Sequence, residues 1–108
     1  MVWRVEILDR RVARELDALD QDLRQRFLRI AELIEQHGIA AMHEPHVKHL
    51  QGKLWEMRMK GRDGVARAIY VTAAGERVVV VHVFSKKTQK TPAGALEVAR
   101  MRAKEIKS

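Results

Sequence analysis

The fold is decided by one stretch of sequence, LWEMRMKGRDGVARAIYVTAAGERVVVVHVFS, which occupies residues 54–85. Apolar and polar residues alternate over 54–60, and β-branched residues are frequent in 65–72 and 77–85, as is typical of strands. The turn-forming segments GRDG at 61–64 and AAGE at 73–76 separate these three runs. We therefore predict an antiparallel meander of three strands. The four consecutive valines at 78–81 indicate that its last strand is central and covered on both faces.

The residues before this stretch predict one more strand and two helices. Residues 2–8 alternate, and such a short strand must pair with the meander to satisfy its backbone. Apolar residues then recur at steps of three and four from Val12 to Ile34, which marks one helical face. Because this run is long for one helix, and Asp9 and Asp20 can each cap a helix, we predict a helical hairpin over 10–20 and 22–37 that ends at Gly38.

Residues 39–53 are predicted to form a connector, because Pro45 and Gly52 punctuate them. After the meander, Thr91 and Pro92 supply an N-cap and a first-turn proline for a last helix over 92–106. The expected order is β-α-α-β-β-β-α in a single domain, 1–108, with the hairpin packed on one side of the sheet. This is a two-layer α+β fold with an antiparallel sheet.

Charge is distributed unevenly along the chain, whose formal net charge is +7. Residues 1–50 contain 8 Lys and Arg against 9 Asp and Glu, a net charge of −1, whereas residues 51–108 contain 13 against 5, a net charge of +8. A strongly basic half indicates an anionic partner, with nucleic acid the commonest and an acidic protein segment the next. A basic surface that only confers solubility is the alternative.

Several classes of protein are excluded or disfavoured. The chain has no cysteine, so it has no disulfide scaffold, no cysteine-based zinc site and no thiol nucleophile. The residues His43, His46 and His49 do not form the HExxH motif, and Pro45 interrupts any helix that could align them, so we expect no metal and no cofactor. Residues 1–6 lack the features of a signal or transit peptide, and no apolar run is long enough to span a membrane, so we expect a cytoplasmic protein.

The candidate chemistry lies on one face of the predicted meander. Period-two spacing brings Glu56, Arg58 and Lys60 to the same side of the sheet, and Arg67 on the next strand is expected nearby. Arg67 lies among apolar residues, where a charge needs a partner or a purpose. A lysine-rich segment that precedes the last helix adds cations at a helix N-terminus, which favours an anion: Lys86, Lys87 and Lys90. Such a patch suits a phosphodiester, although each of these residues could also belong to a solvated surface.

Histidine and tryptophan residues outside this patch are expected to be structural. His82 lies inside the predicted central strand, where a hydrogen-bonded core histidine is expected rather than a catalytic base. Trp3 and Trp55 are expected in the core or at its rim.

Three segments together resemble the RelE/HigB-type toxins of bacterial toxin–antitoxin systems, and in particular their phage-derived branch. They are LQGKLWEMR at 50–58, RAIY at 67–70 and VHVFSKKTQKTP at 81–92. The resemblance implies a RelE-like fold and an mRNA endonuclease that acts mainly in the ribosomal A site. It also implies a cognate antitoxin, often with a helix-turn-helix, that blocks the toxin in a hetero-oligomer. These toxins use basic residues on the meander strands in place of a metal.

By position, Arg58, Arg67 and Lys87 match basic residues of this family, and Lys86 lies beside the last of them. The chain departs from the family pattern at two places. Glu56 replaces a second-strand lysine, and Ala93 and its neighbours lack the tyrosine that the best-studied members carry there. The only tyrosine, at position 70, lies on the third predicted strand, so the resemblance leaves the general base unassigned.

The implied reaction is attack of an RNA 2′-OH on the adjacent phosphate. Arg58 and Arg67 are expected to stabilise the phosphate, since guanidinium groups fit phosphate oxygens. Lys87 is expected to act as the acid or to stabilise charge, and Glu56 as a base or as the group that orients Arg58. The remaining lysines of the patch are expected to bind the RNA backbone: Lys60, Lys86 and Lys90. Two other functions stay open, namely inhibition of DNA gyrase by a ParE-like toxin of the same fold, and a non-enzymatic module that binds an acidic partner.

Overall fold

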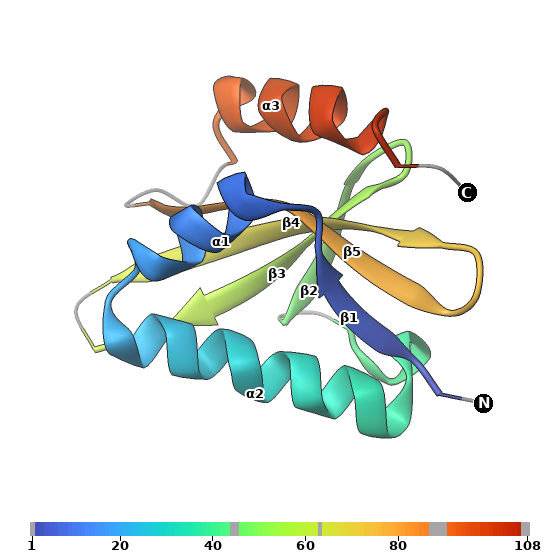
Figure 1. The fold of residues 1–108 in the computed structure, drawn as a ribbon. Coiled ribbons are helices and arrows are strands. Elements are labelled where there is room, and N and C mark those ends of the chain that lie inside the picture. The colour runs from blue at the N-terminus through green and yellow to red at the C-terminus, as the bar shows by residue number, and fades with distance from the viewer. Residues whose placement is uncertain (1, 44–45, 63, 87–90, 107–108) are drawn as a thin grey trace.

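A five-stranded mixed sheet forms the centre of the structure, and helices cover both of its faces (Figure 1). The computed structural model describes residues 2–43, 46–62, 64–86 and 91–106. Its elements are, in chain order, β1 (Arg4–Ile7), α1 (Arg10–Asp17), α2 (Gln21–His37), a short 3₁₀ helix η1 (Ile39–Ala41), β2 (Val47–Gln51), β3 (Leu54–Lys60), β4 (Val65–Ala73), β5 (Arg77–Lys86) and α3 (Ala93–Ala103). Within these residues, no helix is both long and apolar enough to cross a membrane.

The predicted meander is confirmed as β3, β4 and β5, which pair in antiparallel fashion in that order. The sheet order is β1-β5-β4-β3-β2, so β5 is a central strand between β1 and β4. All four of its valines at 78–81 are buried, as their run predicted. The prediction of an antiparallel sheet was wrong, because β1 pairs with β5 in parallel. Two strands so far apart in the chain need no tight turn between them, and either direction is then available.

The prediction of a connector over 39–53 was also wrong, because these residues contain η1 and the edge strand β2. Only Val47 of β2 is fully buried, so the strand leaves little apolar pattern in the sequence. Gly52 directly follows the last residue of β2 and does not prevent strand formation in this segment. With φ of +53° it occupies the turn between β2 and β3, a conformation that glycine adopts without strain.

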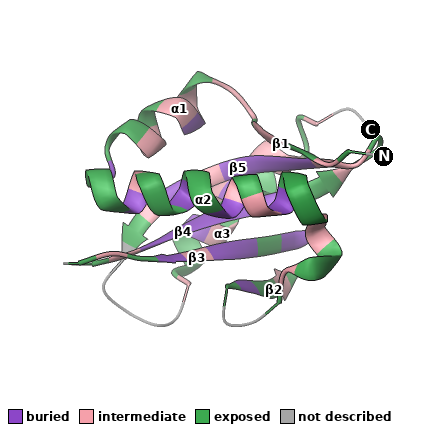
Figure 2. Ribbon diagram, turned by 90° about the horizontal axis from the view of Figure 1, so that it is seen from below, coloured by how far each residue is buried: buried purple, intermediate pink, exposed green. Residues whose placement is uncertain are grey.

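The two N-terminal helices form successively, as predicted, and buried residues of both belong to one core cluster, but the two helices contact different strands. α1 packs on β5, whereas α2 packs on β3, β1 and β4 (Figure 2). Two residues fix the link between the helices. Leu19 is buried in it, and Arg24 donates hydrogen bonds to the carbonyl oxygens of Asp17 (3.1 Å) and Leu19 (2.6 Å). Asp9 caps α1 as predicted, accepting a hydrogen bond from the backbone N–H of Arg11 at 2.9 Å.

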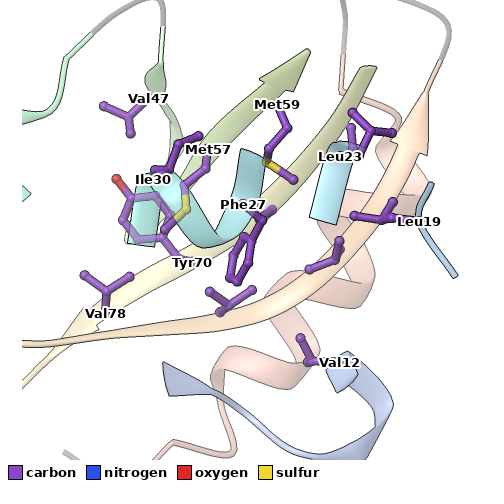
Figure 3. Packing of buried hydrophobic residues seen from close by; sticks show 14 of the residues in the cluster. Val12, Leu19, Leu23, Phe27, Ile30, Val47, Met57, Met59, Tyr70 and Val78 are labelled. Carbon is purple, nitrogen blue, oxygen red and sulfur yellow. The ribbon is translucent and has the colours of Figure 1, made fainter. Parts of the chain in front are cut away.

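The core consists of two clusters on opposite faces of the sheet. The larger one packs beneath α1 and α2, and its apolar helical residues are those that the three-and-four spacing predicted: Val12, Leu19, Leu23, Phe27, Ile30 and Ile34 (Figure 3). The smaller one packs beneath α3 around Ile69, Val81 and Ala99. The two-layer prediction is therefore corrected to three layers. The last helix is also shorter than the predicted 92–106, since it ends at Ala103.

Candidate functional site

The α3 side of the sheet carries a buried carboxylate beside two arginines. The register places Arg58 of β3 directly opposite Arg67 of β4, and Glu56 opposite Ile69 one pleat away. Oε1 of Glu56 lies 3.4 Å from Nε of Arg58 and 3.4 Å from Nε of Arg67. The pattern of the sequence thus predicted correctly that these three residues share one face.

Burial differs sharply among these side chains. Glu56 is 1% exposed and the side chain of Arg67 is 5% exposed, whereas that of Arg58 keeps 23% of its surface in contact with solvent. Burial lowers the pKa of Arg67 below its ordinary value, Glu56 opposes this shift, and the positive charge of Arg58 adds to it. An arginine nevertheless stays protonated in a protein. Two guanidinium groups thus lie beside one carboxylate, and Arg58 is the one that is partly exposed to solvent.

Thr91 is a member of the cluster that sequence reasoning missed. It was predicted to cap the last helix, but no side-chain cap hydrogen bond forms at the start of α3. Instead its hydroxyl donates a hydrogen bond of 2.7 Å to Oε2 of Glu56. The Thr-Pro pair before a helix is such a common capping signal that nothing in the sequence pointed to a carboxylate 35 residues earlier. We call Glu56, Arg58, Arg67 and Thr91 the Glu56 cluster.

The cluster narrows the roles that its residues can take. A general base must reach the proton that it removes, but both oxygens of Glu56 are engaged and the residue is buried. In this structure Glu56 therefore contacts its neighbours in the cluster, and its role as orienting group or as base remains a prediction. The only tyrosine, Tyr70, is buried in the larger core cluster on the opposite face, where desolvation raises its pKa. It does not belong to this site.

Two of the predicted lysines end strands of the sheet. Lys60 is the exposed last residue of β3, and Lys86 is the last residue of β5. Lys87 and Lys90 lie outside the described residues. The structure therefore brings Glu56, Arg58 and Arg67 together, and the proposed lysine contributions remain predictions.

Two of the histidines, His49 and His82, make structural contacts. Nδ1 of His82 lies 3.1 Å from Oε1 of Glu15 in α1, as expected for a hydrogen-bonded core histidine. The imidazole of His49 lies 2.8 Å from the carbonyl oxygen of Gly52, and its ring packs against Trp55 with centroids 4.9 Å apart. In the part of the chain that the structure describes, no three His, Asp or Glu side chains gather in a way that could hold a metal ion.

Comparison with protein families matches residues 14–104 to a family described as "Phage derived protein Gp49-like". Among solved structures, the chain is similar to one in the crystal structure of the archaeal RelE–RelB complex from Pyrococcus horikoshii OT3. The TM-score is 0.58 at 24% sequence identity, over 79% of this chain and 96% of that chain, which shows a shared fold. Comparison with curated proteins gives no match.

Proposed function

The chain belongs to the family of phage-derived Gp49-like proteins and has a RelE-like fold, and from these premises we propose that it is the toxin of a type II toxin–antitoxin system. As such it inhibits translation by cleaving mRNA on the ribosome. The observation that carries the proposal is the Glu56 cluster, in which a buried carboxylate that accepts a hydrogen bond from Thr91 lies 3.4 Å from two guanidinium groups, one of them partly exposed to solvent. Pre-positioned cations of this kind stabilise charge that develops on a phosphate.

The proposed reaction needs no metal. The 2′-hydroxyl of one nucleotide gives up its proton to a general base, and its oxygen bonds to the adjacent phosphorus. The bond from phosphorus to the 5′-oxygen breaks, and a proton from the acid moves to the departing oxygen. The guanidinium of Arg58 contacts the non-bridging phosphate oxygens, which carry increasing negative charge. Arg67, which is buried next to Arg58, supplies a second positive charge, and Glu56 fixes the orientation of both guanidinium groups.

The lysines complete the proposal. Lys87 donates the proton to the leaving oxygen or stabilises its charge, and Lys60, Lys86 and Lys90 bind the flanking backbone. Phosphate contacts of this type fix the position of a nucleic acid without reading its sequence. Codon context would then be set on the ribosome.

An antitoxin is the proposed regulatory partner. The structural neighbour from Pyrococcus horikoshii is a RelE–RelB complex. Here we propose that an acidic segment of the antitoxin competes with RNA for the basic half of the chain, residues 51–108, whose net charge of +8 comes from 13 basic and 5 acidic residues.

A purified translation system tests this function. The protein is added to an mRNA with and without ribosomes, and the new RNA ends are mapped by primer extension. We expect cleavage only when ribosomes translate the message. A parallel supercoiling assay tests the ParE-like alternative. Intact mRNA together with blocked supercoiling would replace the nuclease proposal by gyrase inhibition, and no effect in either assay would leave a non-enzymatic binding module.

A further inference from the structure

A basic groove opens at the edge of the sheet beside the Glu56 cluster. β2 pairs with β3 only as far as Val47 opposite Met57, and the last contact along this edge is a 2.8 Å hydrogen bond from the N–H of Arg58 to the carbonyl oxygen of His46. Beyond it, β3 continues to pair with β4, but on its other edge no strand formed by the described residues pairs with it. A hollow of about 560 Å³ lies between this end of β3 and α2. We call it the β3-edge groove. The lining residues that matter are Asp22, Arg26, His46, Arg58, Lys60 and Arg62.

The groove has a large excess of positive charge. Its lining includes four permanent cations and one carboxylate, a net charge of +3 with His46 neutral. The side chains of Arg26, Lys60 and Arg62 are exposed and, within the described residues, form no salt bridge shorter than 4.0 Å. The carboxylate of Asp22 is already engaged, because it accepts a hydrogen bond of 2.6 Å from the N–H of Arg62. Cations that outnumber the carboxylates of a hollow favour an anionic ligand.

The chemistry of the lining indicates which anion fits. Three of the four cations are arginines, whose planar guanidinium groups match the paired oxygens of a phosphate. The lining contains no Phe, Tyr or Trp among the described residues, so it offers no platform on which bases could stack. A ligand held here is recognised by its backbone charge and not by its sequence.

Arg58 connects this groove to the candidate catalytic cluster, because it is one of the lining residues of the groove and its Nε lies 3.4 Å from Glu56. We propose that the β3-edge groove binds the sugar–phosphate backbone of single-stranded RNA next to the phosphate held by Arg58. This inference rests on the proposed function and assigns Arg26 and Arg62, together with His46, to the path of the RNA. An acidic protein segment is the competing occupant, and sharing of Arg58 with the phosphate site favours RNA over it.

Binding of an uncleavable RNA tests the groove separately from catalysis. The probe is a fluorescein-labelled single-stranded RNA with 2′-O-methyl groups, which lacks the attacking hydroxyl. Its affinity for the full chain is measured by fluorescence anisotropy from 50 to 300 mM KCl, without ribosomes. The test variant is R26A/R62A. The matched control is R14A/R29A, which removes two exposed arginines of α1 and α2 that lie outside the groove lining. Thermal unfolding followed by circular dichroism verifies that both variants are folded.

Loss of two phosphate contacts should change both the salt dependence and the affinity of RNA binding. Each contact to a single strand contributes about 0.7 to the slope of log K against log salt concentration, so R26A/R62A should reduce the slope by about 1.4. At 50 mM KCl the same loss weakens binding by about 10- to 100-fold. The control variant should retain the slope and affinity of the parent.

The proposal is overturned if R26A/R62A and R14A/R29A have the same slope and affinity. It is also overturned if R26A/R62A still binds the RNA but loses binding to a labelled polyglutamate peptide, because the groove would then dock an acidic protein segment. The proposed function fails by a different result, namely absence of mRNA cleavage during translation, which leaves the salt dependence of RNA binding unaffected.

Discussion

The substitution E56Q removes one negative charge from the centre of the Glu56 cluster and leaves its size unchanged. The amide oxygen of glutamine can still accept the hydrogen bond from Thr91, which is 2.7 Å long in the parent. The ion pairs with Arg58 and Arg67, both 3.4 Å long, are lost. The change therefore separates the role of charge from that of packing.

The cost of this substitution follows from burial. The side chain of Arg67 is 5% exposed and that of Glu56 1% exposed, so loss of the carboxylate removes a nearby negative charge from a guanidinium that is almost excluded from water. Removal of one partner from a buried pair costs about 3–5 kcal/mol. The side chain of Arg58 is 23% exposed and regains water, so most of this cost comes from Arg67. At about 4 °C per kcal/mol for a domain of this size, the melting temperature should fall by at least roughly 10 °C.

Urea unfolding followed by tryptophan fluorescence measures this effect, with E6Q as the matched control. Glu6 pairs with Arg77 at 3.1 Å, but both side chains are about one-third exposed, and such a pair contributes only about 0–1 kcal/mol. Parent, E6Q and E56Q are compared at constant m-value. If E56Q loses no more unfolding free energy than E6Q, the ion pairs of the cluster are not the buried interactions that the geometry describes.

Three further predictions concern stability. The hydrogen bond from the N–H of Arg62 lowers the pKa of Asp22 below 3.8 in the folded protein. The ionised Asp22 therefore stabilises the folded state above pH 3.8, and this stabilisation is lost as the pH falls through the lower pKa of the folded state. D22N should therefore melt below the parent at pH 7 and together with it near pH 2; an equal difference at both pH values would contradict this. A Cβ at Gly61 would lie 2.5 Å from Oδ2 of Asp22, so G61A should lower the free energy of unfolding in urea by about 1–3 kcal/mol. An unchanged urea midpoint would show that the turn moves to relieve this contact without loss of stability. T91V removes the hydrogen bond to Glu56 and should cost about 1.5–3 kcal/mol, whereas parental stability would mean that this bond is not retained in solution.

Local sequence patterns predicted the meander and the chemistry on its face. Period-two spacing depends only on the geometry of a strand, so the common face of Glu56 and Arg58 followed directly from it, and the hairpin to the next strand placed Arg67 nearby. The run of four valines likewise predicted a central strand, because only a strand covered on both faces buries successive residues.

Long-range features could not be predicted in the same way. The parallel pairing of β1 with β5 and the placement of α3 opposite α2 depend on how distant segments meet, and no local pattern encodes this. β2 was missed because an edge strand with one fully buried residue carries almost no alternation. The partner of Thr91 was missed because its position before Pro92 has a sufficient local explanation as a helix cap.

The rate of mRNA cleavage on translating ribosomes by R58A tests most directly the claim that the Glu56 cluster presents a guanidinium to the scissile phosphate. R29A, which changes an exposed arginine on α2, is the matched control. We predict that R58A cleaves about 10²- to 10³-fold more slowly than the parent, as for the loss of one pre-positioned charge stabiliser, and that R29A cleaves as fast as the parent. Cleavage by folded R58A at the rate of the parent would contradict the account.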